Sequence, residues 1–494
     1  MIPLEIEHLS VRYGATTALD DVSLRVGAGE IVALVGPSGS GKSTLAAAAM
    51  YLLPSEAIEQ GVVRIEGEDV TTLPERRLRA LRGGRVGIVF QEPATALNTA
   101  LPIGRQIGEV LELHTSLGRA EIEAEVSRLL IRVGLDLSRK RYPHTLSGGQ
   151  RQRVAIAMAI AAQPVLLLAD EPTASLDPVA QAEITTLLLS LVRERGMGLL
   201  LVTHDITLAR RIADRVVTLD QGRIGAPAAP AGELPERAAR AGGDPLLTFA
   251  HVTRTYPGKR ARVAALTDIS FALGKGETLA VIGESGSGKS TLARLALGLD
   301  RPDAGTVTLD GNDWASVRGP ALRGMLGQVQ AVFQDPAASF DPRQTVGRIV
   351  AEPLHLLGPL PAAERVAMVA QALTQVGLPS DAVDRLPQAF SGGQRQRIAI
   401  ARALIRRPDL IVFDEALSAL DPELRDEMVA LLQRLQEELG LTYLFIAHDM
   451  DLVRRMADRV LVLRHGRAVA LGLVAAVLDR PDDPYLAALA ALSE

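Results

Sequence analysis

The sequence of 494 residues contains no cysteine, which excludes disulfides, thiol catalysis, iron–sulfur clusters and cysteine-ligated zinc. No apolar run reaches the 18 or more residues that a membrane-spanning helix needs. The opening segment, MIPLEIEHLS, lacks the basic and then apolar regions of a signal peptide. We therefore expect a soluble, cytosolic chain, unless a partner holds it at a membrane.

An excess of positive charge is also missing. There are 58 acidic and 53 basic residues, for a net charge of −5, so we expect no nucleic-acid partner. The hydrophobic content of 47% is typical of globular proteins, and the length predicts two to four domains. Only five of the basic residues are lysines, so a lysine within a motif is less easily accidental.

The two halves of the sequence repeat the same motifs. SGSGKSTL begins at Ser38 and again at Ser285, and SGGQRQR begins at Ser147 and again at Ser391. A period of about half the chain indicates a duplicated domain rather than a solenoid. We predict domains at residues 1–226 and 247–475, an Ala-, Pro- and Gly-rich linker at 227–246 and a tail at 476–494.

Each half has the pattern of an α/β fold. Continuous apolar runs are typical of central strands in a mostly parallel sheet, whereas the alternation at the start of the chain predicts an antiparallel layer. Helical spacing between Gln91 and Ser147, and between Gln334 and Ser391, predicts a helical insert. The expected central strands are Ile31–Val35, Val165–Ala169, Leu199–Val202, Leu279–Ile282, Leu410–Phe413 and Tyr443–Ala447.

A glycine-rich loop of the form G-x-x-x-x-G-K-[ST] follows the first such strand in each half. Glycines let backbone N–H groups surround a phosphate, and the next helix presents its positive N-terminus to it. The lysine would reach the β- and γ-phosphates, and the serine after it would ligate Mg²⁺. The predicted ATP-binding residues are Gly36, Ser38, Gly39, Gly41, Lys42, Ser43 and Thr44, and Gly283, Ser285, Gly286, Gly288, Lys289, Ser290 and Thr291.

Two acidic residues end a later apolar strand in each half. Asp170 and Asp414 are placed to hold Mg²⁺, and the adjacent Glu171 and Glu415 to polarise the attacking water. A histidine ends the next strand, where His204 and His448 would contact a γ-phosphate oxygen or that water. Acids that cap strand ends and core histidines are the structural alternatives, but the equal spacing in both halves favours catalytic roles.

SGGQ precedes a helical run in each half. A serine and two glycines at a helix start form either a cap or an anion site. Since each half already has a phosphate loop, a second anion site needs a second phosphate or a second protomer. The residues concerned are Ser147, Gly149, Ser391 and Gly393.

The order of phosphate loop, glutamine, SGGQ, Asp-Glu and histidine resembles the ATP-binding-cassette (ABC) ATPase family. The resemblance covers nearly all of both halves. It implies tandem P-loop cassettes that pair internally, so that each ATP lies between one phosphate loop and the other half's SGGQ. It also implies that Gln91 and Gln334 contact ATP and Mg²⁺, and that Tyr13 and Tyr256 stack on adenine unless they pack within the sheet. SLD at Ser175–Asp177 and ALD at Ala419–Asp421 match the family's inter-cassette loops.

Two functions fit such a pair of cassettes. One is the motor of a membrane transporter, and the other is a soluble ATPase acting on ribosomes or nucleic acid. The short, near-neutral linker favours transport. The segments after Gln91 and Gln334 resemble those of the dipeptide, oligopeptide and nickel importer ATPases, and so does the tail, apart from Asp483 where a histidine is usual.

This finer resemblance implies two permease subunits and an extracytoplasmic binding protein as partners. It places the chain on the cytoplasmic face of the inner membrane. The cargo would be a peptide, nickel, an opine or a glutathione-like solute.

Overall fold

The computed structural model describes residues 2–37, 39–54, 56–90, 96–173, 176, 178–225, 243–257, 262–284, 286–333, 339–357, 360–417, 420, 422–479 and 485–486. The expected site residues Ser38, Gln91, Ser285 and Gln334 lie outside the described residues. The chain divides into two compact units, Met1–Leu176 with Ala180–Gly232 and Glu233–Glu494 with Asp177–Val179. Within the described ranges, none of the helices combines the length and apolar character needed to cross a bilayer.

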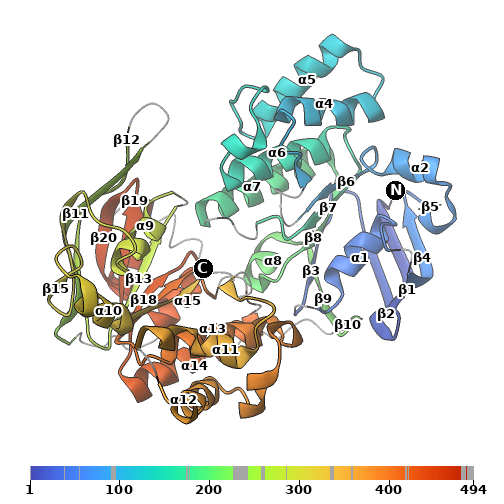
Figure 1. The fold of residues 1–494 in the computed structure, drawn as a ribbon. Helices are drawn as coiled ribbons and strands as arrows, with labels where there is room; N and C mark the ends of the chain where they lie inside the picture. Colours follow the sequence, from blue (N-terminus) through green and yellow to red (C-terminus); the bar gives the residue numbers. More distant parts are fainter. Residues whose placement is uncertain are drawn as a thin grey trace. The chain divides into compact units, whose positions relative to one another are not determined.

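The first unit contains two sheets (Figure 1). A four-stranded antiparallel sheet has the order β2-β1-β4-β5, and a six-stranded sheet has the order β10-β9-β3-β8-β7-β6. The six-stranded sheet is parallel except at β10. The strands are β1 (Leu4–Tyr13), β2 (Thr16–Val26), β3 (Ile31–Val35), β4 (Ala57–Ile65), β5 (Glu68–Asp69), β6 (Val86–Val89), β7 (Leu166–Asp170), β8 (Gly198–Val202), β9 (Arg215–Asp220) and β10 (Arg223–Gly225).

The central strands have continuous apolar sequences because both of their faces are buried. On β7, Leu167 and Ala169 pack into the core that contains the helical insert. Leu166 and Leu168 on the opposite face join the core beneath the antiparallel sheet. Alternate residues of one strand therefore stabilise two different cores. The six predicted central strands are confirmed to within a residue at each end.

Helices cover the two faces of the parallel sheet. Figure 1 shows α4 and α5 of the insert stacked on α6, which packs against β6. The predicted insert is thus confirmed as helical. The helices of this unit are α1 (Lys42–Ala49), α2 (Glu75–Leu81), α4 (Ile103–His114), α5 (Arg119–Arg132), α6 (Gly148–Ile160), α7 (Pro178–Arg195) and α8 (Ile206–Ile212), with 3₁₀ turns η1 (Val70–Thr72) and η2 (Pro143–Thr145).

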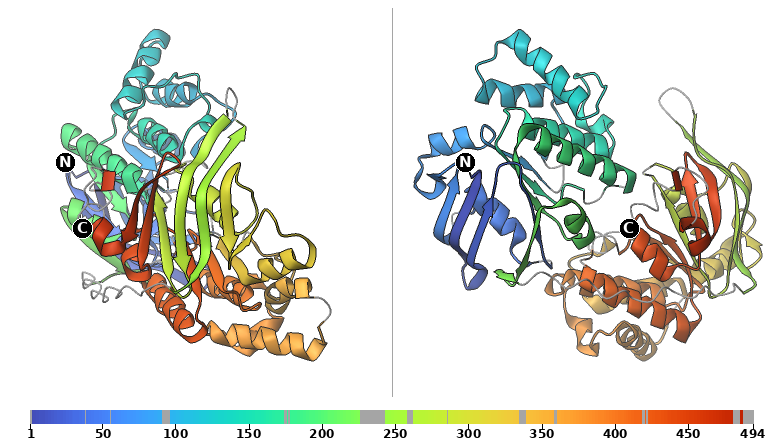
Figure 2. Two further views of the ribbon diagram at one scale, coloured as in Figure 1. Left: turned by 90° about the vertical axis from the view of Figure 1, so that its left-hand side faces the viewer. Right: turned by 180° about the vertical axis from the view of Figure 1, so that it is seen from behind.

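The second unit repeats this plan, with sheet orders β12-β11-β14-β15 and β16-β17-β18-β13-β19-β20. Figure 2 shows its long strands β11 and β12 side by side. Its strands are β11 (Pro245–Pro257), β12 (Arg262–Gly274), β13 (Thr278–Gly283), β14 (Ala304–Leu309), β15 (Asn312–Asp313), β16 (Val329–Phe333), β17 (Leu410–Asp414), β18 (Thr442–Ile446), β19 (Arg459–Arg464) and β20 (Arg467–Leu473). Its helices are α9 (Lys289–Ala296), α10 (Gly319–Gln328), α11 (Val346–Ala351), α12 (Ala362–Gln375), α13 (Gly392–Leu404), α14 (Pro422–Leu439), α15 (Met450–Met456) and α16 (Val474–Leu478), with η4 (Glu352–Leu357), η5 (Ser380–Asp384) and η6 (Pro387–Ala389).

Two segment ends differ from the expected boundaries. Strand β11 begins at Pro245, so the last two residues of the expected linker belong to the second unit's antiparallel sheet. Helix α16 runs across the expected start of the tail at residue 476. Beyond it, Tyr485 and Leu486 are buried in the same core as Val477 and Leu478. Hydrophobic burial therefore extends the second unit at both ends.

Candidate functional site

The first phosphate loop connects buried strand β3 to helix α1. Lys42, only 8% exposed, donates from Nζ to the carbonyl oxygens of Gly36 (2.8 Å) and Pro37 (2.9 Å). Gly41 caps α1 at a φ of 104°, and a Cβ there would lie 2.4 Å from the carbonyl oxygen of Ala18. The loop therefore needs glycine for both its conformation and its close packing.

The second phosphate loop has the same geometry. Nζ of Lys289 donates to the carbonyl oxygens of Gly283 (2.7 Å) and Glu284 (2.9 Å). Gly288 has a φ of 109°, and a Cβ there would lie 2.4 Å from the carbonyl oxygen of Ala265. Each loop curls around its lysine, next to a helix N-terminus whose N–H groups favour an anion. Thr44 and Thr291 lie in the first turn of these helices, and Gly39 and Gly286 lie in the loops with φ values of 80° and 82°.

Sequence reasoning missed one residue in each loop. Ser40 and Ser287 are 3% exposed, and their hydroxyl oxygens have no hydrogen-bond partner in the part of the chain that the structure describes. A buried hydroxyl without a partner is unusual and needs an explanation. The sequence could have indicated these two serines, because each lies inside a phosphate loop directly before Gly41 or Gly288.

Parallel strand order brings the acidic residues toward the loop. Asp170 ends β7, which pairs with β8, and β8 pairs in turn with β3. Burial and the adjacent Glu171 raise the pKa of Asp170, whereas a hydrogen bond from Ser43 and the charge of Lys42 oppose the rise. Burial and Glu415 likewise raise the pKa of Asp414 against the charge of Lys289. The carboxyl group, the serine and the lysine thus share one site.

Each glutamate lies beside the predicted histidine. Nδ1 of His204 is 3.2 Å from Oε1 of Glu171, and Nδ1 of His448 is 3.9 Å from Oε1 of Glu415. Burial raises the pKa of Glu171, but His204 and Lys42 outweigh it, so the pKa is lowered. His448 lowers the pKa of Glu415 more than burial raises it. Both glutamates are therefore ionised at neutral pH and able to accept a proton.

The oxygen atoms at this edge suit a hard cation. The Ser43 hydroxyl and the Asp170 carboxylate are in hydrogen-bond contact, so two oxygen ligands already converge. Among the described residues, there is no cluster of three or more acidic or histidine side chains that could hold a metal ion by itself. This set fits Mg²⁺, which is commonly held by one or two protein oxygens together with phosphate and water.

Each SGGQ serine lies at the N-terminus of a helix. Ser147 caps α6, where its Oγ accepts from the N–H of Gln150 (3.3 Å) and its own N–H donates to that glutamine's side chain (3.1 Å). Ser391 and Gln394 repeat this capping box on α13. Ser147 and Ser391 are exposed, Gly149 is half-buried and Gly393 is buried. The structure thus shows the capping alternative to be present in both halves, with the helix N-terminus still facing solvent at the serine.

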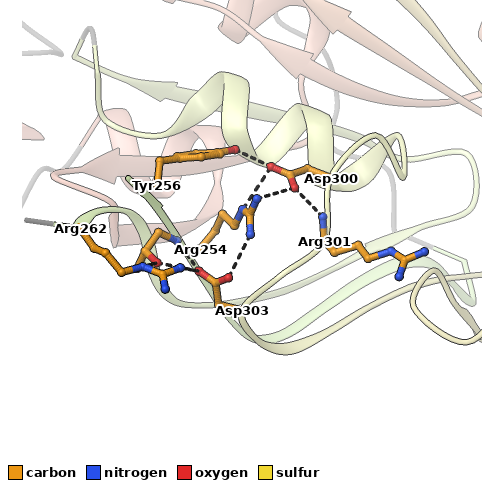
Figure 3. A network of polar contacts seen from close by, with 7 residues as sticks. Arg254, Tyr256, Arg262, Asp300, Arg301 and Asp303 are labelled. Atoms are coloured by element: carbon orange, nitrogen blue, oxygen red, sulfur yellow. Dashed lines mark hydrogen bonds and ion pairs between the residues drawn. The ribbon is translucent and has the colours of Figure 1, made fainter. Parts of the chain in front are cut away.

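The two predicted adenine-stacking tyrosines have different surroundings. Tyr13 packs against the core of the first unit. The Tyr256 hydroxyl donates to Asp300 (2.6 Å), and the Arg254 guanidinium lies over its ring at 4.8 Å (Figure 3). Arg254 also pairs with Asp300 and Asp303. One face of the Tyr256 ring is therefore covered by a cation.

Comparison with known proteins agrees with this geometry. A family model described as "ABC transporter" matches residues 19–174 and again residues 266–418. The chain belongs to the ABC transporter family. It is 42% identical to the peptidoglycan transport ATP-binding protein YejF of Agrobacterium fabrum, over 99% of this chain and 96% of that protein.

Two further relatives extend over nearly the whole chain. An uncharacterized ABC transporter ATP-binding protein YejF of Escherichia coli K12 is 40% identical and covers 99% of each chain. The glutathione import ATP-binding protein GsiA of Escherichia coli O157:H7 is 38% identical, over 98% of this chain and 88% of that protein. The chain is therefore the subunit of an ABC transporter that binds and hydrolyses ATP, and it works with membrane-embedded permease partners. These comparisons give no support to the ribosome or nucleic-acid alternative.

Proposed function

We propose that each unit binds one MgATP at its phosphate loop and hydrolyses it with the neighbouring glutamate. The observation that carries this proposal is the repeated set of lysine, aspartate, glutamate and histidine at one sheet edge. Lys42 and Lys289 would turn from loop carbonyls to phosphate oxygens. Glu171 and Glu415 would take a proton from the attacking water, and His204 and His448 would orient it.

Mg²⁺ would be held by Ser43, Asp170 and Gln91 in the first site, and by Ser290, Asp414 and Gln334 in the second. When bound, the ion neutralises charge on the β- and γ-phosphates. The raised pKa of Asp170 supports this assignment, since a buried carboxylate is stabilised by a nearby cation.

The SGGQ helices are proposed as the second phosphate-binding element. Ser147 with Gly149, and Ser391 with Gly393, would each contact the γ-phosphate of a nucleotide held by the other half's loop. Two observations support this proposal. Each serine is exposed at a helix N-terminus, which attracts anions. The same capping box is present in both halves.

The transported solute is proposed to be a peptide or a related small molecule that is imported. Support comes from the names of the relatives, one a peptidoglycan transporter and the other a glutathione importer. Glutathione is a tripeptide and peptidoglycan carries peptide stems, so peptide chemistry is common to both. We propose that the chain lies at the cytoplasmic face of the inner membrane together with two permease subunits. An extracytoplasmic binding protein would deliver the solute to these permeases.

The test is to isolate the tagged chain from gently solubilised cells of its source, with ATP trapped by Glu171→Gln and Glu415→Gln together. We expect two polytopic membrane proteins and a binding protein, whose ligand can then be identified with labelled peptides. Purification with ribosomes or nucleic acid and without a membrane protein would overturn the transport assignment. A co-purified binding protein that rejects peptides would overturn only the cargo.

A further inference from the structure

The last described residues of the chain pack directly beneath the second phosphate loop. Tyr485 is 7% exposed and Leu486 is 6% exposed, in the same core as α16. An ion pair between Arg454 on α15 and Asp479 holds the chain just after α16. This burial fixes Tyr485 to the body of the second unit.

Tyr485 contacts the loop through its hydroxyl group. The oxygen accepts a hydrogen bond from the N–H of Glu284 at 3.2 Å, and the Arg464 guanidinium covers the ring at 4.6 Å. The carbonyl of the same peptide group, that of Gly283, accepts from Nζ of Lys289. One peptide plane of the loop is thus held at both ends, by the tail and by the phosphate-binding lysine.

The first loop keeps the lysine contact, because Nζ of Lys42 donates to the carbonyl of Gly36, but the tyrosine contact has no counterpart among its described residues. Pro37 occupies the position of Glu284, so its peptide has no N–H to donate. Asp220 ends β9 where Arg464 ends β19. The sequence from residue 226 to 242 contains no tyrosine. The proline ring instead fixes φ at this position covalently.

We propose that Tyr485 is a positioning residue for the second ATP site, where it fixes the Gly283–Glu284 peptide that Pro37 fixes in the first loop. The proposal rests on the proposed function, in which the loop binds nucleotide. Fixing this peptide before ATP arrives lowers the ordering cost of binding. It also makes the second ATP site depend on a residue of the C-terminal segment.

The test measures binding of a fluorescent ATP analogue with Mg²⁺ to the full chain. The Lys42→Ala background leaves the second site, and the Lys289→Ala background leaves the first. Tyr485→Phe, which keeps the ring and removes the hydroxyl, should weaken binding at the second site by about five-fold, as expected for one hydrogen bond. Binding at the first site should not change.

Glu284→Pro gives the second loop the sequence of the first and provides the matched control. In this variant Tyr485→Phe should have no effect, since the N–H is gone and proline fixes the backbone. An equal loss at both sites, no loss at the second, or a loss that persists with Glu284→Pro would overturn the inference. Unchanged binding in the Lys42→Ala, Lys289→Ala double variant would instead show that the proposed ATP sites are wrong.

Discussion

Glu171 and Glu415 share a backbone conformation that is rare for residues with a side chain. Their φ values are 45° and 51°, in the left-handed region. Each N–H donates to the end of the neighbouring strand, to the carbonyl of Val202 (2.8 Å) or of Ile446 (3.1 Å). Such strain persists where the surroundings determine the conformation, and it concentrates at functional sites. The conformation sets the direction in which each glutamate leaves its strand.

Replacing both glutamates by glutamine tests the catalytic assignment. Glutamine has the same shape but cannot accept a proton from water, so turnover should fall at least about 100-fold while ATP binding persists. Steady-state phosphate release and equilibrium binding would measure the two effects. Glu75→Gln, at an exposed carboxylate on α2, is the control and should leave both unchanged. Near-normal turnover in the double variant would remove the glutamates from this role.

Asp170 carries a stability cost in the absence of nucleotide. Because its folded-state pKa is raised, the folded protein binds a proton more tightly than the unfolded chain does, and ionisation lowers stability as pH rises. Asp170→Asn should therefore raise the melting temperature of the nucleotide-free protein at neutral pH. Calorimetry should show that this gain in melting temperature becomes smaller as the pH falls toward the ordinary aspartate pKa of about 4.

Asp300 is the matched control for that experiment. Burial raises its pKa, but Tyr256, the N–H of Arg301 and Arg254 outweigh burial and lower it. Its ionised form therefore adds stability above the unfolded-state pKa, and that stability is lost as pH falls through the lower folded-state value. Asp300→Asn should reduce the melting temperature at neutral pH. Shifts of the same sign for both variants would contradict these assignments.

At the scale of elements, the glycines of the phosphate loop differ in what they do. Gly41 combines a φ of 104° with a position where a Cβ would meet the Ala18 carbonyl and the Leu19 side chain. Gly39 has a φ of 80°, but a Cβ there would meet no atom within 4 Å. The motif alone does not distinguish them, because the contact at Gly41 comes from β2.

Alanine at these two positions should therefore have unequal effects. Gly39→Ala should destabilise the first unit by roughly 1–2 kcal/mol from backbone strain alone. Gly41→Ala should cost more, roughly 3 kcal/mol or above, because a strand carbonyl must also move. Denaturant unfolding of the nucleotide-free protein compares them. Equal losses would show that conformation, and not packing against β2, decides the need for glycine.

The sequence predicts these elements well where local patterns suffice. Runs such as Leu410–Asp414 are apolar because two cores bury them, and the strand order then places the residues that follow at one sheet edge. What it could not predict depends on contacts distant in the chain. The Arg254–Tyr256–Asp300 network joins strand β11 to the segment that precedes β14. Tyr485 contacts Glu284, from which it is separated by 201 positions in the sequence. Gln91 and Gln334 lie outside the described residues and stay predictions.

At the scale of the whole molecule, duplication repeats the chemistry and varies its support. Both lysines bond to the loop carbonyls, and both SGGQ helices carry a capping box. The differences lie around those groups. The first loop has Pro37 where the second has Glu284. Tyr13 packs against the core of its unit, whereas the ring of Tyr256 is covered by Arg254. These differences leave the proposed catalytic groups of both sites in place, so we propose that both sites hydrolyse ATP.

The most direct test of this account counts the ATP molecules retained by each chain. Radiolabelled MgATP bound to the Glu171→Gln, Glu415→Gln protein would be quantified after rapid gel filtration. The account predicts two ATP molecules per chain, and none once Lys42→Ala and Lys289→Ala are added. A single ATP per chain with both loops intact, or retention that does not depend on the two lysines, would contradict it.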